Sequence, residues 1–361
     1  MERYPRLEVK LSSFENNAKE IVKRANEVGV DIAGVVKGAG GDIEVAKAYE
    51  RSGAKWIASS RLGQLEKIKN AGVKIPALVV RISMLSEVED VVRICDYSLQ
   101  SELKVIEALN KEAEKQGKVH NVILMADMGD LREGFWDKDE MAEASLKIDK
   151  EMKNIHLAGI GTNVGCYGSV LPTKEKLEEL VSVAEKIEAK LGRKLEIISG
   201  GATSSLMRLW DGDLPERVNQ LRVGEGALLN RDLVEVYGYK MEGLVTDCFK
   251  IKAEVIEVKR KPTHPVGELG VDAFGHKMTY KDRGMRMRAL LGMGKVDYGD
   301  LGELIPLEKG IELIGASSDH TIVDIEDAEK KYQVGDIMEF DVNYSTLVYM
   351  ANSDDAKIVY K

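Results

Sequence analysis

Cysteine and histidine are both scarce in this sequence of 361 residues. Three cysteines, Cys95, Cys166 and Cys248, are too few and too far apart for a disulfide framework or a zinc knuckle. The five histidines form no ligand pair at helical spacing, so the sequence indicates no metal site. No apolar run approaches the roughly 18 residues of a membrane helix, and the charged first residues lack the apolar core of a signal peptide. We therefore expect a soluble cytoplasmic protein that binds no membrane.

Positive charge is also in deficit. The chain has 52 Lys and Arg against 61 Asp and Glu, which gives a formal net charge of −9. A nucleic-acid-binding surface is normally basic, so nucleic-acid partners are not expected. A hydrophobic fraction of 44% with 31% charged residues is typical of an ordinary globular protein. The length suits one large domain with a smaller one.

The first two-thirds of the chain alternate short apolar runs with amphipathic stretches. The runs that predict strands lie at residues 31–37, 56–60, 76–81, 94–100, 121–127, 156–163, 194–201 and 220–229. Most are continuously apolar, as expected for a parallel sheet that is covered on both faces. Helical periodicity is clearest at 101–117 and 173–192, where Thr173 is placed to cap the second helix.

Eight β–α units in this length predict a closed (β/α)8 barrel of the TIM type. The rival architecture is a doubly wound open sheet, which normally carries a phosphate loop after its first strand. Neither GxGxxG nor GK[ST] follows the first predicted strand.

After about Asp232 the pattern changes to β-forming segments between turns rich in Gly, Pro and Asp. Candidate strands lie at 250–259, 286–292, 311–314, 321–325, 336–342 and 346–350. This pattern predicts a second, mostly β domain. We expect the barrel to span residues 1–232 and the β-domain residues 233–361.

The chemistry of a barrel is expected at the C-terminal ends of its strands. Lys37 ends the first strand, where its amine could form a Schiff base or simply reach solvent. Arg132 and Glu133 follow the fifth strand, as a helical salt bridge or as a carboxylate-binding pair. Asn163 ends the sixth strand, and the nearby Cys166 has no histidine partner in sequence, which favours an inert residue over a thiolate nucleophile.

Two neighbouring loops have the composition of a phosphate site. The seventh strand runs into SGGATSS at 199–205, where backbone N–H groups at a helix start would attract an anion. The eighth supplies QLRVGEG at 220–226, in which Gly224 permits close approach of the backbone. Together the loops favour phosphate over simple turns. A reactive lysine facing a phosphate cradle is what pyridoxal phosphate requires, although class I aldolases share both features.

Longer segments resemble the fold-type III pyridoxal-phosphate racemases, the alanine racemase superfamily, and within it the ornithine racemase branch. The resemblance covers nearly the whole chain and is most specific at NQLRVGEG (219–226), GVDAFG (270–275) and GASSDHTIVDI (315–325). It implies a pyridoxal 5′-phosphate cofactor, two-base proton transfer at the α-carbon, and a homodimer in which each active site is shared between subunits.

The resemblance also implies a role for each matching residue. Lys37 would form the Schiff base and act as one of the two bases. Arg222 would hydrogen-bond the pyridine nitrogen and, since a guanidinium does not readily release its proton, would favour proton removal and return over other reactions. Arg132 would orient the substrate carboxylate, with Ser318 and Asp319 supplied by the partner subunit. The remaining cofactor contacts would be Asn163, Thr203, Ser204, Gly224 and Tyr344.

The second base is where the chain departs from the family. The family uses a tyrosine in the β-domain, and the matching segment here has Phe274, which carries no phenol. The candidates are Asp272, Cys166 and His320, in that order. For a cationic substrate side chain, the carboxylates near the barrel mouth are Asp319, Asp272 and Glu225, although Glu225 could equally pair with Arg222.

These patterns lead to the expectation of an isomerase that interconverts L- and D-ornithine. The alternatives are a racemase of lysine or alanine, a non-catalytic pyridoxal-phosphate carrier of the homeostasis type, and a Schiff-base aldolase without this cofactor. The predicted β-domain counts against the carrier, because such carriers are single barrels.

Overall fold

The computed structural model describes residues 3–271, 274–277 and 279–361 and divides the chain into two compact units. One unit is Leu11–Thr246, and the other joins Met1–Lys10 to Asp247–Lys361. The expected boundary at residue 232 falls at the start of η4 (Asp232–Val236), a π-helical turn within the first unit. Over the described ranges, no helix is both long and apolar enough to cross a membrane.

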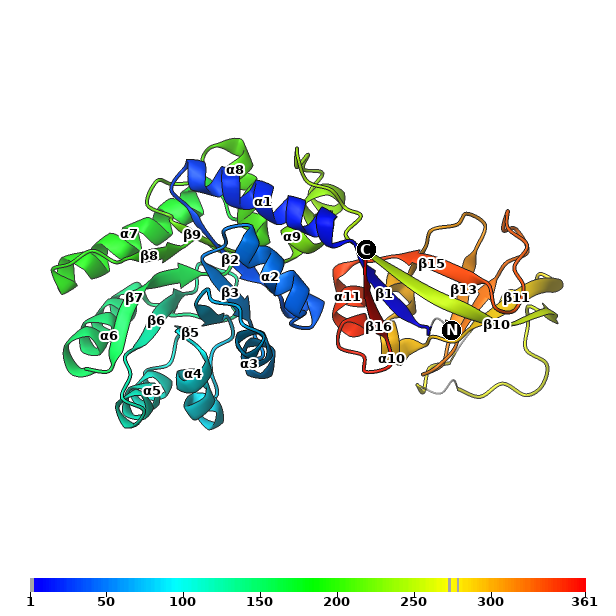
Figure 1. Cartoon of the computed structure of the whole chain (residues 1–361), viewed down its shortest axis with the longest axis horizontal. Helices are drawn as coiled ribbons and strands as arrows, with labels where there is room; N and C mark the ends of the chain where they lie inside the picture. Colours follow the sequence, from blue (N-terminus) through cyan, green and yellow to red (C-terminus); the bar gives the residue numbers. More distant parts are fainter. Residues whose placement is uncertain (1–2, 272–273, 278) are drawn as a thin grey trace. The chain divides into compact units, whose positions relative to one another are not determined.

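The first unit is a closed barrel of eight parallel strands (Figure 1). The strands are β2 (Asp31–Val35), β3 (Trp56–Ser59), β4 (Ala77–Val79), β5 (Tyr97–Gln100), β6 (His120–Ala126), β7 (Ile155–Thr162), β8 (Ile197–Ser199) and β9 (Gln220–Val223). Each pairs with the next, and β9 closes the barrel on β2. All eight overlap the predicted segments, so the predicted (β/α)8 barrel is confirmed. The last is shorter than predicted, because the chain turns at Gly224 into the short helix α9 (Glu225–Leu228).

Helices surround the barrel and bury one face each against it (Figure 1). They are α1 (Leu11–Glu27), α2 (Ile43–Arg51), α3 (Leu62–Asn70), α4 (Val88–Ile94), α5 (Leu103–Lys115), α6 (Lys138–Glu151), α7 (Lys174–Leu191) and α8 (Leu206–Asp211), with short turns η1 (Lys37–Ala39), η2 (Leu85–Glu87) and η3 (Thr203–Ser205). The predicted cap is confirmed, because the Thr173 side chain accepts a hydrogen bond from the Lys176 N–H. Gly192 ends α7 in the left-handed conformation, with φ of 71°.

The barrel core is apolar and tightly packed. Ala33, Trp56, Leu78 and Ile197 belong to a buried cluster that draws on β2 to β8. On the outside, Tyr49 of α2 packs where Gly34 leaves room, since a Cβ on Gly34 would lie 2.4 Å from the Tyr49 Cγ. The Tyr49 hydroxyl donates to the carbonyl of Val223 (2.9 Å) and so fixes α2 to the C-terminal end of β9.

The second unit is a mostly antiparallel sheet, which confirms the predicted β-domain. Its main path runs β12 (Ile305–Pro306), β15 (Ile337–Asp341), β10 (Phe249–Pro262), β11 (Met285–Leu291), β14 (Thr321–Asp324) and β13 (Glu312–Ala316). Strand β1 (Arg6–Val9) pairs with β10 and with β16 (Lys357–Tyr360), so both ends of the chain enter this sheet (Figure 1). The unit also holds α10 (Lys295–Tyr298), α11 (Tyr344–Met350) and the turn η5 (Leu301–Glu303).

The strand predicted at 346–350 is wrong, because this segment forms α11. The Asn343 side chain accepts a hydrogen bond from the Thr346 N–H (2.9 Å) and caps the helix start. Leu347 and Met350, three residues apart, are fully buried on one face. The helix cap and the burial of one helical face therefore override the preference of these side chains for a β-strand.

Candidate active site

Lys37 lies directly after β2 and opens the turn η1. Its side chain has access to solvent, but the surrounding protein atoms partly desolvate the amine. This desolvation lowers the pKa of the amine below its ordinary value. The charge of Cys166 and that of Glu133 act to raise the pKa, and those of Arg132 and Arg222 lower it further. An amine with a lowered pKa keeps more of its nucleophilic neutral form near neutral pH.

Arg222 is a buried cation on β9. Its Nη1 donates to the Ser199 Oγ (2.5 Å), and its Nη2 donates to the carbonyl of Thr162 (2.6 Å). In the part of the chain that the structure describes, no carboxylate forms an ion pair with it, and desolvation lowers its pKa to about 10. A buried charge with only neutral partners is costly to keep, so its retention beside Lys37 points to a group that it binds there.

Three loops after β7, β8 and β9 are joined by close contacts. The Gly226 N–H donates to the Thr203 Oγ1 (3.1 Å), and the Ser204 hydroxyl donates to the carbonyl of Val164 (3.0 Å). A Cβ on Gly224 would lie 3.2 Å from the carbonyl oxygen of Val35, which is tighter than a side chain normally allows. The predicted pair of loops therefore forms one continuous wall beside the end of β2.

Asn163 follows β7 directly, and its Nδ2 is a buried donor without a partner among the described atoms. An unpaired buried amide donor is costly unless something outside the chain accepts its hydrogen bond. The amide therefore lies ready for an acceptor at the same end of the barrel as Lys37.

Arg132, Glu133 and Cys166 come together from two different loops. The Nε and Nη2 of Arg132 bind both carboxylate oxygens of Glu133, and its Nη1 donates to the Cys166 Sγ (2.9 Å). The pair lies in the β6–α6 loop, so the helical form of the salt bridge is wrong. Hydrogen bonds to Glu133 hold the pKa of Arg132 well above its ordinary value, so its guanidinium stays charged.

Asp130 is a residue that sequence reasoning missed. It is buried, and its carboxylate accepts hydrogen bonds from the backbone N–H groups of Cys166 (3.4 Å) and Tyr167 (3.0 Å). It thereby ties the β6–α6 loop to the β7–α7 loop and fixes Cys166 beside Arg132. Its position after a buried strand in Asp-Met-Gly-Asp was the available signal.

Several predicted residues belong to the second unit or lie outside the described residues. Ser318, Asp319 and His320 form the turn between β13 and β14 in the second unit, where the carbonyls of Ser317 and Ser318 accept from the first N–H groups of α10. Tyr344 opens α11 in the same unit. Asp272 lies outside the described residues.

Glu225 does not pair with Arg222. Its Oε1 accepts from the backbone N–H groups of Arg231 (2.7 Å) and Asp232 (3.1 Å), and it is buried. Desolvation, helped by the charge of Asp232, raises the pKa of Glu225 to about 7. This carboxyl is therefore engaged with the chain that leaves α9.

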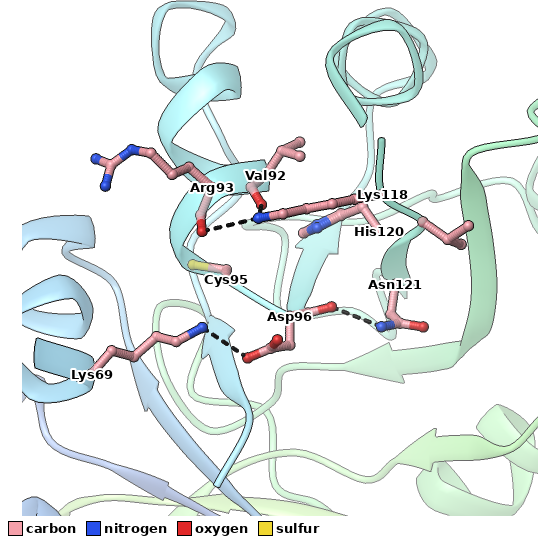
Figure 2. A pocket seen from close by; sticks show the side chains of 9 residues that line it. Lys69, Val92, Arg93, Cys95, Asp96, Lys118, His120 and Asn121 are labelled. Atoms are coloured by element: carbon pink, nitrogen blue, oxygen red, sulfur yellow. Dashed lines mark hydrogen bonds and ion pairs between the residues drawn. The ribbon is translucent and has the colours of Figure 1, made fainter. Parts of the chain in front are cut away.

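A separate pocket opens at the other end of the barrel, where β5 and β6 begin (Figure 2). Charged groups that line it already have partners within the protein. Lys69 contacts Asp96 (3.4 Å), and Lys118 donates hydrogen bonds to the carbonyls of Val92 and Arg93. His120 is buried beside it, and desolvation lowers its pKa to about 4. Because barrels carry their chemistry at the C-terminal ends of the strands, the groups around Lys37 form the candidate active site.

The chain is similar to proteins of known activity. A family model described as alanine racemase, N-terminal domain, matches residues 9–229. The ornithine racemase of Acetoanaerobium sticklandii is 40% identical over 345 residues, which cover 96% of each chain. The lysine racemase of Thermotoga maritima is 38% identical over 358 residues, which cover 99% of each chain. Among solved structures, the alanine racemase of a D-cycloserine-producing Streptomyces lavendulae has a TM-score of 0.77 at 16% identity, covering 100% of this chain and 98% of its own.

Proposed function

Because this chain belongs to the alanine racemase family and is an amino-acid racemase, we propose that it interconverts L- and D-ornithine with pyridoxal phosphate as cofactor. The observation that carries the proposal is the buried Arg222 guanidinium, which no carboxylate pairs in the described structure, near the Lys37 amine whose pKa is lowered. An aldolase that forms a Schiff base with its substrate needs the lysine but not a buried cation beside it.

The residues present fit pyridoxal phosphate. Lys37 supplies the amine for the aldehyde, and Arg222 supplies a donor for the pyridine nitrogen. Thr203 and Gly224 lie in the joined loops that would hold the phosphate, where a Cβ on residue 224 would crowd Val35. The unpaired amide donor of Asn163 suits an oxygen on the ring. When bound, the cofactor supplies an electron sink that makes the α-proton of an amino acid removable.

The residues of the chain then have the following tasks. Lys37 exchanges a proton with the α-carbon, because its lowered pKa leaves more of the amine in the neutral form that accepts a proton. Arg132 binds the substrate carboxylate with the guanidinium edge that Glu133 leaves free. Arg222 keeps its own proton and holds the cofactor ring in place.

The choice of ornithine rests on two observations. The ornithine racemase and the lysine racemase are almost equally similar to this chain over its full length. Ornithine and lysine, the substrates named for these two relatives, both carry a second amine that alanine lacks. Lysine is therefore the nearest alternative substrate and alanine a weaker one.

The active enzyme is proposed to be a homodimer with shared sites in the cytoplasm. Large apolar side chains are exposed on the loops at the Lys37 end of the barrel, among them Leu131, Trp136, Tyr167 and Leu171. Such a patch marks a protein contact more often than a free surface. In this arrangement the partner's second unit supplies Ser318 and Asp319. A reducing compartment suits a chain whose three cysteines are all free.

The test is α-proton exchange with chirality followed in the same sample. The cofactor-loaded protein is incubated in heavy water with L-ornithine, L-lysine or L-alanine, and α-deuteration and enantiomer content are measured together. We expect racemisation to be fastest with ornithine, and Lys37→Ala to abolish it and the visible absorbance of the bound cofactor. Faster turnover of lysine would change the substrate, and exchange with none of the three despite bound cofactor would favour a carrier.

A further inference from the structure

Racemisation needs an acid–base group on each face of the α-carbon, and Lys37 accounts for one. The tyrosine that supplies the other in the related alanine racemases is replaced here, since Phe274 stands in the matching segment. A second group has to be found among the other side chains of this protein. The neighbours of Lys37 in the barrel unit are the first place to look.

Most acidic groups near Lys37 are already engaged. Both carboxylate oxygens of Glu133 are bound by Arg132. Both oxygens of Asp130 accept backbone N–H groups in the β7–α7 loop. A carboxylate whose two oxygens both accept hydrogen bonds from the protein is not free to move toward a substrate.

Cys166 differs from these carboxylates in exposure and in partners. Its side chain is exposed, and its sulfur accepts one hydrogen bond, from the Arg132 Nη1 (2.9 Å). Cys166 also lies near enough to Lys37 to act electrostatically on the pKa of its amine. The sulfur is therefore exposed, held by a single cationic donor, and free to meet a substrate.

The geometry of Arg132 would bring the sulfur close to a substrate whose carboxylate binds this guanidinium. Glu133 occupies the Nε–Nη2 edge of the guanidinium, which leaves the Nη1–Nη2 edge for a substrate carboxylate. Cys166 lies on Nη1. Because the carboxylate of an amino acid is bonded to its α-carbon, a substrate held at that edge brings its α-carbon close to the sulfur.

We propose that Cys166 is the second acid–base residue of the racemase, with Lys37 acting on the opposite face of the α-carbon. This inference rests on the proposed function. For one enantiomer the Cys166 thiolate takes the α-proton, and the electron pair of the broken C–H bond forms the new bond to a proton from the Lys37 ammonium group. Thiol and amine are then left, and the opposite enantiomer reacts in reverse. Proton exchange with solvent also restores the thiolate and the ammonium group. The cycle only moves protons, so it needs no oxidant or reductant.

The other cysteines provide an internal control for a direct test of the thiol. Cys95 and Cys248 are buried, and desolvation raises the pKa of each to about 12. Iodoacetamide should therefore label Cys166 first in the holoenzyme, which mass spectrometry of the digested protein can establish. Arg132→Met removes the positive charge beside the sulfur, whereas Arg132→Lys keeps a positive charge there.

The two roles of Arg132 give opposite results in this test. If the guanidinium stabilises the thiolate, Arg132→Met slows alkylation of Cys166 several-fold and Arg132→Lys changes it much less. If Arg132 only shields the sulfur, Arg132→Met speeds alkylation. The second result would overturn the proposal without any measurement of racemase activity.

The catalytic test uses Cys166→Ala and Cys166→Ser, with Cys248→Ala as the matched loss of a thiol from the other unit. We expect both Cys166 variants to bind the cofactor but to lose racemisation by at least about 100-fold. In heavy water they should still exchange the α-proton of the enantiomer that Lys37 serves, without inversion. Cys248→Ala should racemise at a rate close to that of the unmodified protein.

Failure of this inference is distinguishable from failure of the proposed function. If the unmodified protein racemises none of the three amino acids, the proposed function fails. If it does racemise one of them and Cys166→Ala keeps that rate, Cys166 is not the second base. Loss of exchange for both enantiomers in Cys166→Ala, with cofactor still bound, would also contradict separate roles for the two residues.

Discussion

Arg222 tests the cofactor assignment at the scale of a residue. It donates to Ser199 and to the carbonyl of Thr162 through two separate nitrogens. Arg222→Lys keeps the charge but loses the planar fork, so we expect cofactor affinity to fall by at least about tenfold. Loss of one buried hydrogen bond costs about 1–2 kcal/mol of stability, which the barrel should survive. Spectroscopic titration of the apoprotein with pyridoxal phosphate measures the affinity, and an unchanged affinity would contradict the role of the fork.

Glu225 should make stability depend on pH. Its pKa is raised to about 7 by desolvation, whereas it ionises near 4.5 in an unfolded chain. The folded protein therefore holds this proton more tightly, and stability falls as pH rises from about 4.5 to about 7. Glu225→Gln keeps an acceptor for the N–H groups of Arg231 and Asp232. We expect it to be stabilised by about 2 kcal/mol at pH 8 and little changed at pH 5.

Denaturant unfolding of both proteins across this range checks the effect. The difference between variant and unmodified protein isolates Glu225 from the other groups that titrate. A difference that stays constant from pH 5 to pH 8 would show that Glu225 does not change its charge in this window.

Most of the candidate site could be predicted one residue at a time. Lys37, Asn163 and Arg222 lie on strands or within two residues of a strand end, and Arg132 lies in the loop after β6. The C-terminal ends of parallel strands meet at one face of a barrel. The partners of these residues could not be predicted, because they come from other strands and loops. Asp130 bonds the backbone 37 residues further along the chain. Such pairs depend on loop conformation, which composition and periodicity do not fix.

Glu188 shows how one side chain joins elements. It is buried in the last turn of α7 and binds Arg217 (2.5 Å), Lys194 (2.7 Å) and the backbone N–H of Leu195 (3.0 Å). Burial alone raises its pKa, but these hydrogen bonds outweigh burial and hold the pKa at about 2. The carboxylate therefore fixes the end of α7 to the chain before β8 and before β9.

Glu188→Gln should weaken this junction. We expect a loss of about 2 kcal/mol in the free energy of unfolding at pH 7, since the charged acceptor is lost. The stabilisation is present above about pH 4.5 and is lost as pH falls toward 2, so the difference between the proteins should shrink over that range. Thermal unfolding at a series of pH values checks it, and a difference that persists at pH 2 would contradict the assignment.

At the scale of elements, periodicity predicted the barrel better than the β-domain. Short apolar runs and amphipathic helices alternate eight times, and no local signal opposes them. In the second unit, local capping by Asn343 converts a β-forming segment into α11. Strand β1 is four residues long and pairs with β10 and β16, more than 200 residues away, so no local pattern reveals it.

At the scale of the whole molecule, the exposed patch predicts self-association. Trp136 and Tyr167 are 68% and 73% exposed on the loops at the Lys37 end of the barrel. If they are buried in the dimer, Trp136→Ser with Tyr167→Ser should weaken the dimer at least about tenfold, because aromatic side chains dominate such contacts. Val119→Ser, at the other end of the barrel and 59% exposed, is the control. Sedimentation over a range of concentrations measures the dissociation constant of the dimer. Equal dissociation constants for the double variant and the control would show that this patch is not part of the interface.

The proposed sharing of the active site between subunits predicts complementation. Lys37→Ala disables the barrel side of a site, and Asp319→Ala should disable the side that the partner's second unit contributes. In a mixed dimer, the barrel with intact Lys37 meets the second unit with intact Asp319, so one of its two sites is complete. Random mixing makes half of the dimers mixed, so about a quarter of all sites should be restored.

The two inactive proteins are therefore unfolded together, refolded with cofactor, and assayed beside each variant refolded alone. Recovery near one quarter of the unmodified activity requires that residues of both chains act at one substrate. If each site were built from a single chain, every site in the mixture would keep one defect and activity would stay at the level of the separate variants. If the Asp319→Ala variant is active by itself, Asp319 is not part of the active site.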